Sequence, residues 1–150
     1  MATFGQSFDG RGISGLAFAG SDLYLAEKAA VTRITGGGNA VPTFIDALAP
    51  TAIVSDGVNW IFVADTPIAN TNILRYGLSP NTRDIYANIG VLPDGTTKPF
   101  QFVSGLAVDS MANLYIGDEY CQNLRGKDRP AGAIRSRDTG IVKTRLLQQI

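Results

Sequence analysis

The sequence predicts an all-β protein built from three related units of antiparallel strands. Three segments repeat one pattern of short apolar strands, turn-forming residues are frequent, and no amphipathic helix stands out before residue 140. Seventeen glycines and seven prolines in 150 residues favour a chain that turns often. The hydrophobic fraction of 45% is enough for an ordinary globular core.

In each unit we predict a strand, a tight turn, a second strand, a loop and a third strand, in that order. The units cover residues 14–34, 50–76 and 104–137. A short apolar run opens each unit, and the second strand has an aromatic centre and ends in a small residue and an acid: Ala26-Glu27, Ala64-Asp65 and Gly117-Asp118. The third strand places a basic residue among apolar ones, and these residues are Arg33, Arg75 and Arg135.

The spacing of the units predicts the size of a β-propeller blade. The aromatic centres Tyr24, Phe62 and Tyr115 are 38 and 53 residues apart, near the roughly 40 to 50 residues of a four-stranded blade. Fourth strands are predicted at residues 41–45 and 84–89. The longer second interval requires an insertion, and residues 90–100 (GVLPDGTTKPF) have the composition of a loop or hairpin.

We therefore expect one domain over residues 1–150, a β-propeller-like array of about three four-stranded antiparallel blades. Its repeat units are expected at about residues 10–46, 47–98 and 99–150. In the last unit, residues 119–132 predict an exposed excursion before a third strand at residues 133–135. Residues 140–150 predict a closing strand, with a short helix as the alternative.

Several function classes are excluded by residues that the sequence lacks. Without histidine the chain cannot supply a Ser-His-Asp triad or a His-ligated zinc, and its single Cys121 cannot form an intrachain disulfide. Thirteen basic and thirteen acidic residues leave no net charge that would select nucleic acid. No segment has the length of a membrane span or the composition of a signal peptide, so we expect a soluble chain, unprocessed or already mature.

Residues 105–109 (GLAVD), together with Asn113, Leu114, Tyr115 and Asp118, resemble the NHL-type propeller repeat. Residues 50–76 resemble the same repeat as it occurs in the gluconolactonase-like family. The resemblance implies a six-bladed β-propeller, of which this chain supplies about three blades. In that family a divalent cation, typically calcium, lies in the central channel, held by a Glu, the Asn of a P-N-G motif and the Asp of a P-D-G motif.

The cation ligands of that family are not matched here. The P-N-G position reads Pro50-Thr51-Ala52, so a hydroxyl replaces the amide, and the P-D-G position reads Val103-Ser104-Gly105, so the carboxylate is missing. Because of these departures and the absence of histidine, we favour a protein that is not an enzyme. We predict no catalytic residue and no cofactor, with calcium as the cofactor of the alternative.

The recurring acids Glu27, Asp65 and Asp118 are the weak metal candidates. Equivalent positions in successive blades lie at similar radius, so three carboxylates could converge on a cation. The more ordinary interpretation, which we favour, is that each accepts backbone hydrogen bonds from the loop after its strand. For the three arginines we likewise favour cross-strand pairing with a neighbouring acid over an anion site.

Three residues are the candidates for binding or interface contacts. Trp60 is predicted to be half-exposed beside a turn, where it either anchors an interface or covers the sheet. Tyr120 and Arg125 lie in the exposed excursion.

The length of the chain leads to the functional hypothesis. Three blades cannot close a conventional ring, and an open array leaves apolar faces and strand edges uncovered. We therefore expect a non-enzymatic structural or interaction module that self-associates, as a dimeric ring or a strand-donating filament, and presents loops for protein binding. The expected partners are homo-oligomer subunits or further blades, with no nucleic acid and no membrane insertion. An extracellular or periplasmic location is slightly favoured.

Two alternatives remain. One is a propeller-type, lactonase-like hydrolase or lyase that uses a channel divalent cation. The other is a ligand sensor whose channel binds a sugar or peptide.

Overall fold

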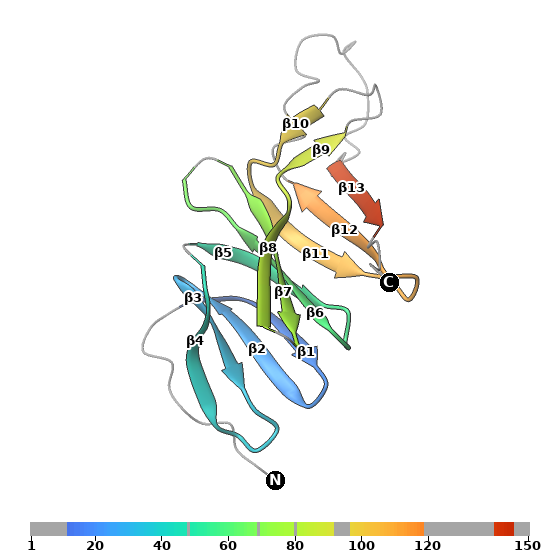
Figure 1. Ribbon diagram of the computed structural model, residues 1–150. Helices are drawn as coiled ribbons and strands as arrows, with labels where there is room; N and C mark the ends of the chain where they lie inside the picture. The colour runs from blue at the N-terminus through green and yellow to red at the C-terminus, as the bar shows by residue number, and fades with distance from the viewer. Residues whose placement is uncertain are drawn as a thin grey trace, which may run out of the picture.

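The computed structural model describes residues 12–47, 49–68, 70–79, 81–91, 97–118 and 140–145. Within these ranges every regular element is a β-strand, which confirms the all-β prediction (Figure 1). The strands form several small antiparallel sheets rather than one large sheet. Among the residues described, none belongs to a helix with the length and apolar character that crossing a membrane requires.

Three sheets follow the three sequence units, and each is a meander in which strands adjacent in sequence are hydrogen-bonded neighbours. The first sheet contains β1 (Ile13–Ala19), β2 (Asp22–Glu27), β3 (Ala30–Ile34) and β4 (Ala40–Asp46). The second contains β5 (Pro50–Ser55), β6 (Trp60–Asp65), β7 (Asn72–Leu78) and β8 (Asn81–Ala87). The third contains β11 (Val103–Val108), β12 (Asn113–Asp118) and β13 (Gly140–Arg145).

The predicted insertion forms a separate hairpin. Its strands are β9 (Ile89–Val91) and β10 (Thr97–Pro99), and they pair in antiparallel register. Residues 92–96, which join the two strands, lie outside the described residues. The hairpin explains why the second and third units are farther apart in sequence than the first and second.

In the last unit, the third strand is formed by other residues than those we predicted. The strand that pairs with β12 is β13, at Gly140–Arg145, whereas we expected the third strand at residues 133–135. Residues 133–135 lie outside the described residues. Residues 140–145 therefore form a strand, not the alternative short helix, and this strand takes third place in the sheet.

A β-bulge recurs at the same position of all three first strands. The pairing of β1 with β2 shifts between Ile13 and Gly15, so Ser14 is an extra residue without a cross-strand partner. Thr51 and Ser104 occupy this position in β5 and β11. A bulge bends the strand and re-aims the side chain of the extra residue.

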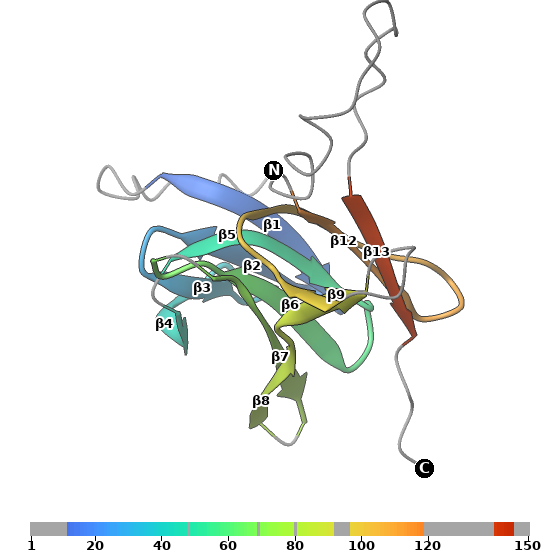
Figure 2. The same ribbon diagram turned by 90° about the horizontal axis from the view of Figure 1, so that it is seen from above.

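The sheets pack side by side through their first strands: β1 lies against β5, and β5 lies against β11. Figure 2 shows the result from above, with β1 and β5 on one side of the molecule and the fourth strands, β4 and β8, on the other. β1 and β5 thus each have a hydrogen-bonded neighbour within their own sheet and a packed neighbour in the following sheet.

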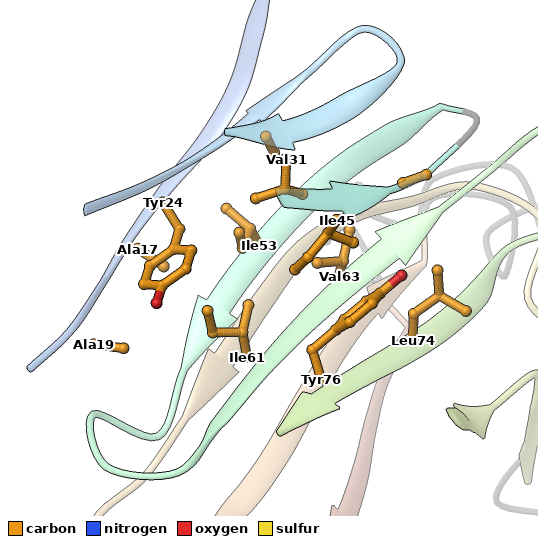
Figure 3. Packing of buried hydrophobic residues seen from close by; sticks show 12 residues of the cluster. Ala17, Ala19, Tyr24, Val31, Ile45, Ile53, Ile61, Val63, Leu74 and Tyr76 are labelled. Atoms are coloured by element: carbon orange, nitrogen blue, oxygen red, sulfur yellow. The ribbon is translucent and has the colours of Figure 1, made fainter. Parts of the chain in front are cut away.

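Two apolar cores fill the spaces between the sheets. The first joins the first sheet to the second, where Tyr24 faces Ile53 and Ile61 (Figure 3). The second joins the second sheet to the third and includes Phe62 and Leu114, both fully buried. A buried side chain of this size contributes about 1.5–3 kcal/mol to stability, so these two cores hold the three sheets in one array.

The closest approach between the first two sheets occurs at Gly15. A Cβ atom at this residue would lie 2.9 Å from Cγ2 of Ile53 and 3.3 Å from the Ile53 backbone nitrogen. Gly15 is therefore required because β5 occupies the space that a side chain would need.

We predict that Gly15→Ala destabilises the protein by about 1–3 kcal/mol, because the new methyl group overpacks the contact with Ile53. Urea unfolding measures the change. Gly12→Ala is the control, since a Cβ at Gly12 meets nothing within 4 Å. Equal stability of the two variants would contradict the account.

Candidate functional site

Two of the three acids that end the second strands, Asp65 and Asp118, accept hydrogen bonds from the chain segment that enters their own sheet. Asp65 Oδ1 accepts a hydrogen bond from the backbone N–H of Ala49 at 2.7 Å. Asp118 accepts bonds from the backbone N–H groups of Gln101 and Phe102 at 3.1 and 3.2 Å. Both acids are buried. The donors precede the first strand, whereas we expected them in the loop after the second strand.

Glu27 occupies the same position in the first sheet with a different arrangement. It is buried, and its Oε2 accepts a hydrogen bond from the Thr32 hydroxyl at 3.1 Å. Among the described residues no donor reaches its Oε1. Glu27 thus binds a neighbouring strand of its own sheet, and the three acids are each used locally.

The described ranges contain no group of three or more His, Cys, Asp or Glu side chains that could hold a metal ion. Thr51 and Ser104, which stand where the resemblance led us to look for cation ligands, are the bulged residues of β5 and β11. A hydroxyl at a bulge is a hydrogen-bond donor as well as an acceptor. Its chemistry here suits contact with a neighbouring carbonyl.

The hydroxyls of Ser14 and Thr51 link successive sheets. Ser14 Oγ lies 2.7 Å from the carbonyl oxygen of Pro50, at the start of β5. Thr51 Oγ1 bonds in the same way to the carbonyl oxygen of Val103, at the start of β11. Sequence reasoning missed these residues because a bulge leaves no mark in the alternation of apolar and polar residues. The recurring Ser/Thr before Gly or Ala was the available signal.

Two of the predicted arginines form ion pairs across strands, which confirms the structural interpretation for them. Arg33 Nε bonds to Asp22 Oδ2 at 2.7 Å, and this bond lowers the pKa of Asp22. Arg75 binds both carboxylate oxygens of Asp84. Arg135 lies outside the described residues.

Of the three predicted interface residues, only Trp60 is among the residues described. It is half-buried against the second core, and the Arg75 guanidinium lies 4.5 Å from the centre of its ring. A cation over an indole face is an attractive arrangement. Trp60 thus covers the sheet while part of its ring remains accessible. Tyr120 and Arg125, like Cys121, lie outside the described residues.

Asp109 organises the turn between β11 and β12. Its carboxylate accepts bonds from the backbone N–H groups of Met111 and Asn113, from Asn113 Nδ2 and from the Tyr115 hydroxyl, all at 2.7–2.9 Å. These donors, the Asn113 backbone foremost, lower the pKa of Asp109 to about 2. Asp56 holds the β5–β6 turn in the same way, through three backbone N–H groups at 2.9 Å.

The first sheet exposes apolar side chains that the second sheet buries. Leu16 and Ile53 occupy the same register position of their sheets, yet Leu16 is 60% exposed and Ile53 only 7%. Phe18, two residues further on the same face of β1, is 67% exposed. The difference arises because the first sheet covers Ile53, whereas no described sheet precedes the first.

The last sheet is open on its opposite face. Tyr24 and Phe62 are buried by the following sheet, but the equivalent Tyr115 is only half-buried. Ala107, next to Tyr115 in the pairing of β11 with β12, is exposed, whereas the equivalent Ala17 is buried. The array thus ends in one open apolar face at β1 and another at β11.

A shallow, open depression of about 500 Å³ lies beside the β9–β10 hairpin. Three asparagines, two prolines and two isoleucines line it, so it holds no titratable group that could act as an acid or base. Asparagine side chains can bind polar ligands through amide hydrogen bonds. Nothing in this lining selects one class of ligand.

Comparison of the chain with protein-family models and with curated proteins finds no match. The functional assignment therefore depends on the geometry described above.

We expect Asp65→Ala to lower the free energy of unfolding by about 1–3 kcal/mol, because it leaves the N–H of Ala49 without an acceptor. The loss should be the same with calcium and with a chelator, since the acid bonds to backbone and not to a cation. Thermal unfolding measures both. Thr82→Ala, at an exposed position of β8, is the control. A calcium-dependent melting temperature in the parent protein that Asp65→Ala abolishes would refute this interpretation.

The lowered pKa of Asp109 predicts a contribution to acid sensitivity. Its carboxylate is ionised in the folded state down to about pH 2, against an ordinary value of 3.8. The stabilisation is present above pH 3.8 and is lost as the pH falls towards 2. Between these values the unfolding free energy should therefore fall more steeply in the parent protein than in Asp109→Asn. Parallel pH profiles would show that Asp109 makes no such contribution.

Proposed function

We propose that the chain is a non-enzymatic structural module, a partial β-propeller that self-associates and presents its loops for binding. The proposal rests on the exposure of Leu16 on β1, where the equivalent Ile53 of the next sheet is covered, together with the exposure of Phe18 on the same face. Removing such side chains from water contributes about 1.5–3 kcal/mol each. A partner that covers this face therefore gains stability from it.

The propeller arrangement is our inference from three features. The sheets are consecutive antiparallel meanders, their first strands lie side by side, and the fourth strands of the first two sheets, β4 and β8, lie on the opposite side (Figure 2). These features are typical of propeller blades around a central axis. Because propellers have about four to eight blades, three sheets leave a ring incomplete. Two copies would supply six.

The chemistry of the acids favours a structural role over a lactonase-like one. A channel cation needs carboxylate oxygens that are free to bind it. Both oxygens of Asp118 and one oxygen of Asp65 already accept backbone hydrogen bonds. Glu27 Oε1 is the buried side-chain oxygen that has no donor among the described residues, and one such oxygen falls short of the roughly six to eight oxygen ligands that calcium takes.

The proposal is tested by the mass of the protein in solution, measured by light scattering across a dilution series and accompanied by negative-stain imaging. We expect a dimer or a longer assembly that dissociates on dilution. The double variant Leu16→Ser, Phe18→Ser should remain monomeric, because the open face of β1 becomes polar. Val58→Ser, at an exposed valine of the β5–β6 turn, should assemble like the parent.

A folded monomer at every concentration would overturn the proposal. Assembly that is unaffected by the double variant would also overturn it, since self-association would then use another surface.

A further inference from the structure

The two contacts between neighbouring sheets follow one rule. The bulged hydroxyl of one first strand bonds to the carbonyl oxygen at the start of the next: Ser14 to Pro50 and Thr51 to Val103. Each hydroxyl also approaches a carbonyl of its own second strand, that of Ala26 at 3.3 Å or Ala64 at 3.4 Å. The hydroxyl thus joins three strands at one point.

A small residue follows the hydroxyl and allows the close approach. Gly15 and Ala52 occupy this position in β1 and β5, and a Cβ at Gly15 would meet Ile53 of the next sheet at 2.9 Å. The contact therefore has two parts. The polar part is the hydrogen bond from the hydroxyl of one first strand to the carbonyl of the next. The apolar part is a branched side chain of the next strand that lies over a glycine or alanine.

The third sheet contains the hydroxyl and the small residue of this contact, but no described strand supplies the carbonyl and the branched side chain. Ser104 is the bulged residue of β11, it is exposed, and Gly105 follows it. A Cβ at Gly105 would meet no atom within 4 Å. No described sheet follows β11 in the array, so the hydroxyl and the glycine face an open side.

The first sheet contains the groups that are missing there, a carbonyl at the start of β1 and an exposed branched side chain. Ile13 stands at the start of β1 and pairs with Glu27, as Pro50 pairs with Asp65 and Val103 with Asp118. Its carbonyl is therefore equivalent to the two carbonyls that accept the bulged hydroxyls. Leu16 is equivalent to Ile53, and it is exposed.

We propose that the Ser104 hydroxyl donates a hydrogen bond to the Ile13 carbonyl of a second copy of this chain, whose Leu16 packs over Gly105. This inference rests on the proposed function and specifies its interface as head to tail. The partner of β11 is a second copy because each chain carries the hydroxyl and glycine at β11 and the carbonyl and leucine at β1. Successive first strands already make this contact twice within one chain. With thirteen basic and thirteen acidic residues, two copies also meet without net repulsion.

The first test places a side chain where β1 of the second copy would lie. Gly105→Val should fold like the parent protein, because the space is open within one chain, but its self-association by analytical ultracentrifugation should be lost. Thr82→Val, at an exposed position of the outer strand β8, is the control and should assemble normally.

The second test removes only the hydroxyl. Ser104→Ala should weaken self-association about 3- to 10-fold per contact, the range expected for one hydrogen bond. Ser104→Thr should restore the parent affinity, because threonine holds the equivalent position 51 in the second sheet. These variants keep the inference testable if Gly105→Val fails to fold.

A mixing experiment tests the head-to-tail direction. Gly105→Val leaves the open face at β1 intact, and the double variant Leu16→Ser, Phe18→Ser leaves the open face at β11 intact. An equimolar mixture of the two variants should therefore form a heterodimer, although neither variant associates alone. A parent protein that assembles while Gly105→Val and Ser104→Ala assemble equally well would overturn this interface and leave the proposed self-association standing. A parent protein that stays monomeric would overturn both.

Discussion

Successive first strands approach one another closely, and the packing of the three sheets follows from this approach. β1 reaches β5 at the van der Waals limit because Gly15 has no side chain opposite Ile53. At that separation the faces of the two sheets can exclude water from Tyr24, Ile53 and Ile61 together (Figure 3). The second core repeats the arrangement between the second and third sheets. An array built by one repeated contact has two unlike ends, and the end at β1 exposes Leu16 and Phe18.

Polar groups along the first strands fix the register of this packing. The β-bulge turns the Ser14 and Thr51 hydroxyls towards the next sheet, and Asp65 and Asp118 hold the segments that enter the later sheets. The Thr51 hydroxyl lies within hydrogen-bond distance of two carbonyl oxygens and so joins neighbouring strands. Hydrogen bonds to buried carbonyls are directional, so they define how one sheet sits on the next in a way that apolar contact alone does not.

Much of the secondary structure could be predicted because it has a periodic signature. The aromatic centres Tyr24, Phe62 and Tyr115 all fall on second strands, and the proline-rich insertion is a hairpin. The third strand of the last sheet was misplaced, because local pattern does not specify which of two short apolar runs pairs with β12. The turn role of Asp109 depends on four donors that are positioned by the folded turn. The contacts of the Ser14 and Thr51 hydroxyls could not be predicted, because they depend on the register of the strands. Register is determined by the pairing between strands and not by the pattern within one strand.

The most direct measurement is a cryomicroscopy structure of the assembled protein at side-chain resolution. We expect β1 of one copy to lie against β11 of the next, with the Ile13 carbonyl beside the Ser104 hydroxyl and Leu16 buried over Gly105. Subunits that meet through two β1 strands, or an assembly in which Leu16 and Phe18 remain exposed to solvent, would contradict this expectation.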